Sequence, residues 1–160
     1  MKKVLFILLL IVTWSFEAQV NNFVMHKNKM IWENVFLTEG SDIPNLIIRH
    51  PQLSITSVNG KKYNGTCKDV NYVCENTSEY MSQKMSFDFQ IEIQKGKYRV
   101  TIFNLQFSKQ GLPAAKAKAE DYFVEKGNLK TQDKTVRDMD CMDAYFNKIF
   151  TMTAVYKNKL

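Results

Sequence analysis

The residues of this chain with the chemistry for catalysis or metal binding are few, and they lie far apart. The 160 residues include two histidines, His26 and His50, and three cysteines. Neither histidine has a metal-binding spacing, such as two histidines four residues apart. A nucleophilic pair would need His50 beside Cys67 or Cys141, and nothing in the sequence brings them together. We therefore expect no catalytic residues, and a structural role for His50 at the end of a short helix.

An acidic run, "DMDCMD" at residues 138–143, brings several carboxylates close together. Calcium sites use such ligands. Three carboxylates in the first turns of a helix are also typical of surface charges that match the helix dipole, and we favour that interpretation. The chain has no glycine-rich phosphate loop and no Gly-x-Ser-x-Gly motif. We therefore predict a protein that is not an enzyme and that holds no metal and no cofactor.

The chain begins with "MKKVLFILLLIVTWSFEAQV", which has the layout of a secretory signal peptide. Two lysines precede nine unbroken apolar residues, Val4 to Val12, and a more polar end follows. The apolar run is shorter than the roughly 20 residues of a membrane-spanning helix; an uncleaved N-terminal anchor is the alternative. We predict a signal peptide at residues 1–18, cleaved before Gln19. The mature protein would then be periplasmic or extracellular, without a transmembrane helix.

Export bears on the cysteines, because an oxidising compartment permits disulfides. Cys67 and Cys74 flank "KDVNYV", and a hairpin centred on Val70 and Asn71 would place them opposite each other. The sequence predicts either a disulfide between these two cysteines or two half-buried thiols on adjacent strands. Cys141 is then expected as a small apolar residue on a helix.

The most regular stretch is "QIEIQKGKYRVTI", residues 90–102. Lys95-Gly96 suits a tight hairpin turn, because glycine adopts a positive φ without strain. Apolar residues then face apolar ones and polar face polar, so the register is strongly specified. The predicted cross-strand pairs are Ile93 with Tyr98, Glu92 with Arg99, Ile91 with Val100, Gln90 with Thr101 and Phe89 with Ile102. Beyond Ile102 the apolar positions shift by one, which predicts either a bulge or a strand covered on both faces.

The remaining patterns predict further strands and helices on either side of this hairpin in the sequence. A strand is expected at residues 29–37, and a second hairpin turns at Asn59-Gly60. A short helix is expected within residues 41–51, and an alanine-rich helix from Pro113 to Gly127. A final amphipathic helix covers residues 136–150, where apolar residues recur at three- and four-residue spacing. Those residues are Met139, Met142, Phe146 and Ile149.

This order of elements predicts an α+β fold with an antiparallel, curved sheet of about five strands and its helices packed on one face. We expect a flexible N-terminal stretch at residues 19–28, a single domain at residues 29–150 and a C-terminal tail at residues 151–160.

Three segments of the chain resemble a known family. They are "KMIWENVF", "FQIEIQKGKYRVTIFNLQF" and "MDAYFNKIF", and the most specific element is the Gly-Lys-Tyr-Arg of the hairpin, Gly96 to Arg99. The family consists of exported proteins of Gram-negative bacteria and is defined only as domain of unknown function 4468. Its fold is similar to that of the TATA-box-binding protein (TBP). The resemblance implies a TBP-like fold and offers no catalytic residues. DNA binding does not follow from a shared fold.

We therefore expect an exported, non-catalytic binding or accessory module of the bacterial cell envelope. The formal net charge of +6 comes from lysines mixed with acidic residues, which is typical of a solvated surface, and no nucleic acid partner is expected. The alternative is a carrier that holds an apolar small molecule between the sheet and the C-terminal helix. Its pocket would be lined by Met139, Met142, Phe146 and Ile149, which otherwise form ordinary core. The expected partner is accordingly another envelope protein or an apolar small molecule.

Overall fold

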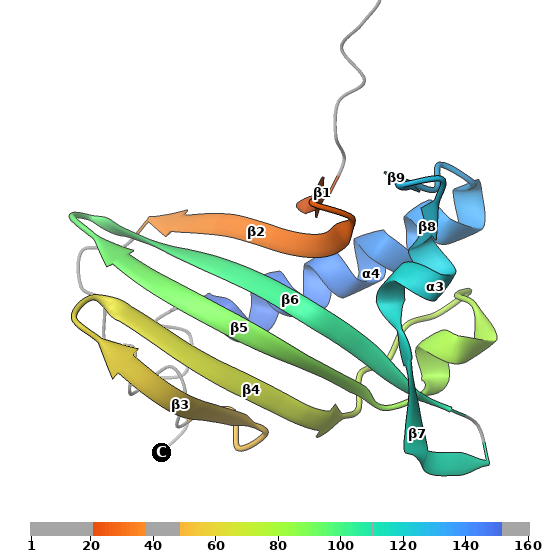
Figure 1. The fold of residues 1–160 in the computed structure, drawn as a ribbon, viewed down its shortest axis with the longest axis horizontal. Helices are drawn as coiled ribbons and strands as arrows, with labels where there is room; N and C mark the ends of the chain where they lie inside the picture. Colours follow the sequence, from red (N-terminus) through yellow and green to blue (C-terminus); the bar gives the residue numbers. More distant parts are fainter. Residues whose placement is uncertain (1–20, 38–48, 110, 152–160) are drawn as a thin grey trace, which may run out of the picture.

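The computed structural model describes residues 21–37, 49–109 and 111–151 (Figure 1). The predicted signal peptide lies outside the described residues. So do the predicted C-terminal tail apart from Thr151 and most of the short helix expected within residues 41–51.

Seven of the described strands form one antiparallel sheet, and a long helix crosses it. The sheet order is β1-β2-β6-β5-β4-β3, and β7 also pairs with β6. The sheet strands are β1 (Phe23–His26), β2 (Lys29–Leu37), β3 (Leu53–Asn59), β4 (Lys62–Val70), β5 (Met85–Gln94), β6 (Lys97–Lys109) and β7 (Leu112–Lys118). The other elements are the 3-10 helix η1 (Glu79–Ser82), α3 (Ala119–Phe123), the small hairpin of β8 (Val124–Glu125) and β9 (Asn128–Leu129), and α4 (Asp133–Phe150).

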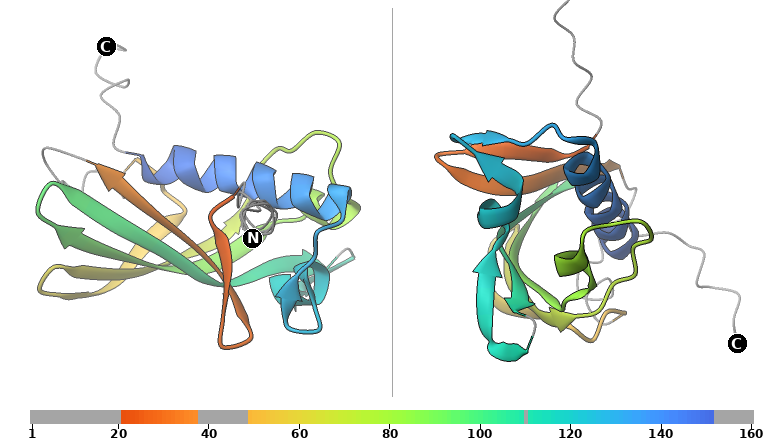
Figure 2. Two further views of the ribbon diagram at one scale, coloured as in Figure 1. Left: turned by 90° about the horizontal axis from the view of Figure 1, so that it is seen from above. Right: turned by 90° about the vertical axis from the view of Figure 1, so that its right-hand side faces the viewer.

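The sheet curves around α4, which lies along its concave side (Figure 2). The predicted α+β architecture, an antiparallel sheet with a C-terminal helix on one face, is therefore confirmed. The number of strands was predicted wrongly, because the sheet has seven strands rather than about five.

The central hairpin has the predicted register. Every predicted pair between β5 and β6 is present, and Gly96 takes a φ of 72° in the turn. Glu92 lies opposite Arg99, but their ion pairs run outward to the neighbouring strands. Glu92 lies 3.8 Å from Lys62 on β4, and Arg99 lies 3.8 Å from Glu33 on β2. Because β5 and β6 are both central strands, each has a second neighbouring strand, and that strand supplies the opposite charge.

The shift of apolar positions beyond Ile102 is a bulge. Asp88 pairs with Phe103 and Ser86 with Gln106, so β6 carries one extra residue there. Asn104, within the bulge, has a φ of 52°. The buried positions of β6 consequently change from even to odd numbers: Tyr98, Val100 and Ile102 before the bulge, Leu105 and Phe107 after it.

Residues 23–26, predicted to be flexible, form β1 and pair with β2. Phe23 is 1% exposed, and its ring packs on Phe146 of α4 with the ring centroids 6.2 Å apart. The burial of this phenylalanine orders the segment, and the domain thus begins before Lys29.

The alanine-rich helix predicted from Pro113 to Gly127 is wrong over most of its length. Only Ala119–Phe123 is helical, and Leu112–Lys118 forms β7 on the edge of β6. Lys116 and Lys118 are exposed on either side of the buried Ala117, an alternation with the period of a strand. Strand pairing here overrides the helix propensity of alanine. The second predicted hairpin is present, with Gly60-Lys61 rather than Asn59-Gly60 as its two turn residues.

The apolar face of α4 packs into the sheet as core. Met139, Met142, Phe146 and Ile149 are 3%, 0%, 0% and 5% exposed. The Phe146 ring contacts those of Trp32 and Phe87, with centroids 5.4 Å and 5.2 Å away. The four residues predicted as either a pocket or a core are therefore buried core residues.

Gly65 on β4 lies where no side chain fits. A Cβ there would lie 2.5 Å from the Ser54 carbonyl oxygen and closer still to the Phe89 ring. We expect Gly65→Ala to lower the free energy of unfolding by about 2 kcal/mol, because the backbone of β3 must move. Urea unfolding measures this, with Thr66→Ala on the opposite face of the same strand as control. Equal effects of the two substitutions would contradict the expected close contact.

Candidate functional site

Two strands, β2 and β7, pair with the same side of β6 and leave a gap between them. Lys97–Ile102 pairs with β2, and Gln106–Lys109 pairs with β7. Between these ladders, that edge of β6 has no strand partner in the described part of the chain. The gap coincides with the bulge at Asn104, because an extra residue interrupts the ladder.

A cleft of about 450 Å³ lies at this gap, and we call it the edge cleft. The turn between β1 and β2, the β6 bulge and the start of α3 line it. The lining residues are Lys27, Asn28, Lys29, Asn104, Leu105, Gln106, Lys118, Glu120 and Asp121.

The backbone of the edge cleft is held in uncommon conformations. Lys27 and Asn28 form the two-residue turn between β1 and β2 with φ values of 48° and 63°, and Asn104 lies across from them with 52°. Asparagine tolerates this region, whereas lysine rarely adopts it. Positive φ at both central residues is what a two-residue hairpin turn requires, so the values at Lys27 and Asn28 follow from the turn itself. The backbone N–H of Met30 donates to Glu120 Oε1 at 3.1 Å and so joins the turn to α3.

A second hollow, of about 240 Å³, adjoins the edge cleft. Asn104 and Gln106 line both, so the two hollows are neighbours, and we refer to them together as the outer groove. The other residues of this hollow are Thr66, Cys67, Lys68, Ser86, Phe87, Asp88 and Lys116. Lys68 and Asp88 alternate with the buried Cys67 and Phe87. The hollow therefore lies on the sheet face away from α4.

The outer groove contains a serine beside a lysine, an arrangement that can form a nucleophile and base. Lys116 Nζ donates to Ser86 Oγ at 2.7 Å. Lys116 also lies 3.2 Å from Asp69 Oδ1, to which the Ser86 hydroxyl donates at 3.3 Å. The hydrogen bond and charge of Lys116 lower the pKa of Asp69. A carboxylate whose pKa is lowered is a weak base for the serine proton, and Ser86 Oγ also accepts a hydrogen bond from the Asp69 backbone N–H at 3.0 Å. The cluster is therefore structural rather than an activated nucleophile.

His50 and the cysteines do not form the nucleophilic pair considered above. His50 is half-buried, and its pKa is lowered by burial and then by the charges of Arg49 and Lys148. Cys141 is bonded to Cys74 and is not a thiol. Burial raises the pKa of the Cys67 thiol to about 12. Across residues 21–37, 49–109 and 111–151, no cluster of three or more His, Cys, Asp or Glu is placed to hold a metal ion.

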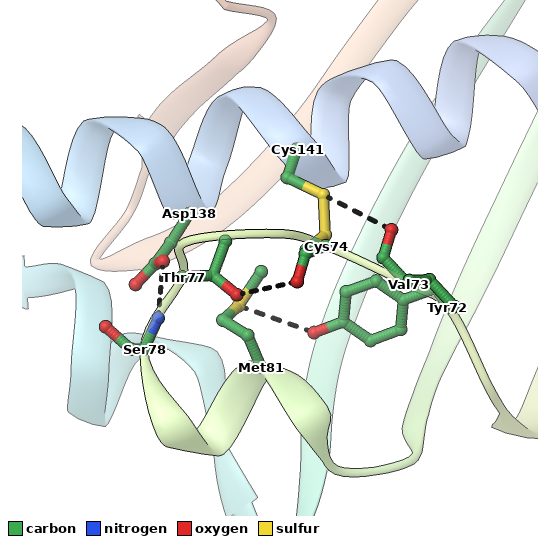
Figure 3. Close-up of a disulfide and its surroundings, with 8 residues drawn as sticks. All are labelled: Tyr72, Val73, Cys74, Thr77, Ser78, Met81, Asp138 and Cys141. Carbon is green, nitrogen blue, oxygen red and sulfur yellow. Dashed lines mark hydrogen bonds between the residues drawn. A yellow bond between two sulfur atoms is a disulfide. The ribbon is translucent and has the colours of Figure 1, made fainter.

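The disulfide joins Cys74 to Cys141, so the predicted pairing of Cys67 with Cys74 is wrong (Figure 3). Strand β4 ends at Val70, and the chain continues as a loop toward η1 instead of turning back in a hairpin. This loop runs beside α4, which places Cys74 opposite Cys141, with their Cα atoms 6.1 Å apart. Cys67 remains a buried free thiol.

The carboxylates of the acidic run bind the protein itself. Asp138 is 0% exposed and accepts hydrogen bonds from the Ser78 backbone N–H at 2.9 Å and the Tyr80 hydroxyl at 2.7 Å (Figure 3 shows the first). Asp143 accepts one from the Trp32 indole at 2.7 Å. The interpretation as surface charges is therefore wrong for Asp138. The helix α4 begins at Asp133, so Asp138 lies beyond its first turn. Buried hydrogen-bond donors need an acceptor, and the Asp138 carboxylate provides one.

Cys67 should resist alkylation in the folded protein. Only a thiolate reacts, and a pKa of about 12 leaves few thiolates near neutral pH. We expect iodoacetamide at pH 8 to leave the folded protein unmodified and to add one adduct in urea without reductant. Mass spectrometry of both samples measures this. Modification of the folded protein at the rate of the unfolded one would contradict the buried position of Cys67.

The described hollows are not lined by the residues predicted to form an apolar pocket. The outer groove does not include Met139, Met142, Phe146 or Ile149. A third hollow lies beside the stacked rings of Tyr80 and Tyr122, and a fourth around Glu125 and Lys130.

Two solved structures are similar to this chain. A TBP-like protein from Parabacteroides distasonis superposes with a TM-score of 0.53 at 15% identity, over 79% of this chain and 94% of that one. A DUF4468 family protein from Bacteroides ovatus gives a TM-score of 0.49 at 13% identity, over 82% and 87%. No family model and no curated protein sequence matches the chain.

The likeness to the Parabacteroides protein shows that this chain has a TBP-like fold. The TBP-like fold expected from the resemblance is therefore confirmed. In the part of the chain that the structure describes, no helix is long and apolar enough to cross a membrane.

Proposed function

We propose that the protein is an exported, non-catalytic binding module of the bacterial cell envelope. The observation that carries this proposal is the outer groove. It is open, most of its lining residues are polar or charged, and the lysine of its serine–lysine pair forms an ion pair with Asp69. A site with these properties suits recognition better than covalent chemistry.

Export is supported by two independent features. Residues 1–18 have the layout of a signal peptide. The disulfide between Cys74 and Cys141 is the kind of bond that persists in an oxidising compartment.

The position of α4 supports a binding site on the outer face of the sheet. The concave side of the sheet is filled by α4, whose apolar residues are buried against it. The alternative function, a carrier of an apolar small molecule, draws no support from the described hollows, because the residues it needs are packed as core. Its test remains native mass spectrometry, in which a carrier would retain a small-molecule mass.

Cell fractionation of the full-length protein, expressed with a C-terminal tag in a Gram-negative host, tests the proposal. We expect a periplasmic or extracellular protein that begins at Gln19, with a mass about two daltons below that of the reduced chain because one disulfide has formed. The purified protein should bind isolated envelope material saturably. A cytoplasmic protein that keeps residues 1–18, or an exported one that binds no envelope material, would refute the proposed function.

A further inference from the structure

We propose that the outer groove binds an anionic carbohydrate, a sugar chain that carries carboxylate or phosphate groups. This inference rests on the proposed function and names the ligand class of the same site.

The first argument is the state of the charges in the groove. Five lysines and three carboxylates line it. The side chains of four of these lysines make no hydrogen bond or ion pair with any described residue; they are Lys27, Lys29, Lys68 and Lys118. All four are exposed. The groove therefore presents cations that an anion can reach.

The carboxylates, by contrast, already accept hydrogen bonds from the protein. Glu120 accepts from Met30 N–H at 3.1 Å, and Asp121 from Lys118 N–H at 3.2 Å. Asp88 accepts from Asn104 Nδ2 at 2.7 Å. These hydrogen bonds leave the carboxylates charged, and the five lysines and three carboxylates together give the lining a net charge of 5 − 3 = +2, which favours a negative ligand.

The second argument is the hydrogen-bonding character between the lysines. Asn104 and Gln106 lie at the junction of the two hollows, and Asn28 lines the edge cleft. Side-chain amides carry both donors and acceptors, which suits sugar hydroxyl groups. Because the two junction residues line both hollows, a ligand bound beside them lies next to the lysines of both hollows.

The third argument separates a sugar from other polyanions. The one aromatic residue in the lining of the groove, Phe87, is 2% exposed. A single-stranded nucleic acid would need an exposed ring for its bases to stack on. Leu105 is 3% exposed and Cys67 1%, so the apolar side chains of the lining are themselves buried and form no exposed patch for an acyl chain.

The test uses the disulfide-bonded mature protein and measures binding by isothermal titration. The probes are an oligogalacturonate, which carries carboxylates, a phosphorylated malto-oligosaccharide, a neutral malto-oligosaccharide of equal length and a short single-stranded DNA. We expect binding to one or both anionic sugars that weakens as salt is raised. The two anionic probes distinguish carboxylate from phosphate. Equal binding of the neutral sugar, tighter binding of the DNA, or binding of no probe would overturn the proposal.

The matched variants are Lys27→Gln with Lys118→Gln in the groove, and Lys95→Gln with Lys134→Gln outside it. Each pair removes two exposed lysines. One exposed ion pair contributes about a two- to fivefold change in affinity, so we expect the groove pair to weaken binding about tenfold. The control pair should stay within about twofold of the wild type, and circular dichroism should show both variants folded.

Envelope binding separates this inference from the function on which it rests. If the groove variant still binds envelope material like the wild type, the groove assignment is wrong and the binding module stands. If the wild-type protein binds no envelope material, the proposed function itself fails.

Discussion

Replacing both disulfide cysteines, Cys74→Ala with Cys141→Ala, is expected to lower the free energy of unfolding by about 4 kcal/mol. The bond joins residues 67 positions apart. A cross-link over a loop of this length removes much of the conformational entropy of the unfolded chain, which gives about this value. The bond also holds the loop between β4 and β5 against α4. Urea unfolding followed by the fluorescence of the buried Trp32 measures the loss, and dithiothreitol should produce a similar loss in the wild type.

The control for this prediction is Cys67→Ala, which also decides between the two pairings. With the bond between Cys74 and Cys141, this variant keeps the mass deficit of about two daltons that marks one disulfide. If Cys67 were bonded to Cys74 instead, the native bond would be lost. Absence of the deficit in this variant would therefore refute the pairing found in the structure.

Asp143→Ala is expected to destabilise the protein by about 3 kcal/mol. The Asp143 carboxylate accepts hydrogen bonds from the Trp32 indole N–H at 2.7 Å, the Asn22 side chain at 2.8 Å and the Asn22 backbone N–H at 3.2 Å. Asn147 Nδ2 donates a further one at 3.0 Å. Because Trp32 is 0% exposed, its N–H would be left without an acceptor in the core. An unsatisfied buried donor costs about 1–3 kcal/mol, and hydrogen bonds to a charge add to this.

Asp140→Ala is the matched control, one helical turn away. Asp140 accepts one hydrogen bond, from Asn21 Nδ2 at 3.1 Å. It should cost less than about 1 kcal/mol in the same thermal or urea unfolding experiment. Asp143→Asn should fall between the two, because it keeps an acceptor oxygen for the indole. Equal losses in Asp140→Ala and Asp143→Ala would contradict the role assigned to the Trp32 hydrogen bond.

Local alternation was enough to predict the central hairpin and the strand at residues 29–37. In both, adjacent residues alternate between apolar and polar, because successive side chains of a strand point to opposite faces of the sheet. The final helix was predicted from another local pattern, apolar residues at three- and four-residue spacing. The alanine-rich segment was misread because helix propensity was given more weight than the alternation of Lys116, Ala117 and Lys118, a signal that was present in the sequence.

The candidate site could not be predicted, because it depends on contacts between distant segments. The edge cleft joins the turn at Lys27 and Asn28 to the bulge at Asn104 and to Lys118. No pattern of neighbouring residues indicates that β2 and β7 pair with the same side of β6. The same holds for the disulfide, since the position of Cys74 depends on the path of a loop and not on the spacing of cysteines. The positive φ values of the turn and the bulge are likewise invisible in the residue types, apart from the preference of asparagine for them.

The position of α4 has a consequence for the order in which the protein can fold. The helix follows every strand of the sheet in the chain, yet it covers their common apolar face, and Asp143 binds Asn22 at a sequence separation of 121. During synthesis, the strands that emerge first therefore have no cover for their core until the helix is complete. Such long-range closure is slow compared with local folding. For the export proposed above, this delay would keep the nascent chain unfolded during translocation.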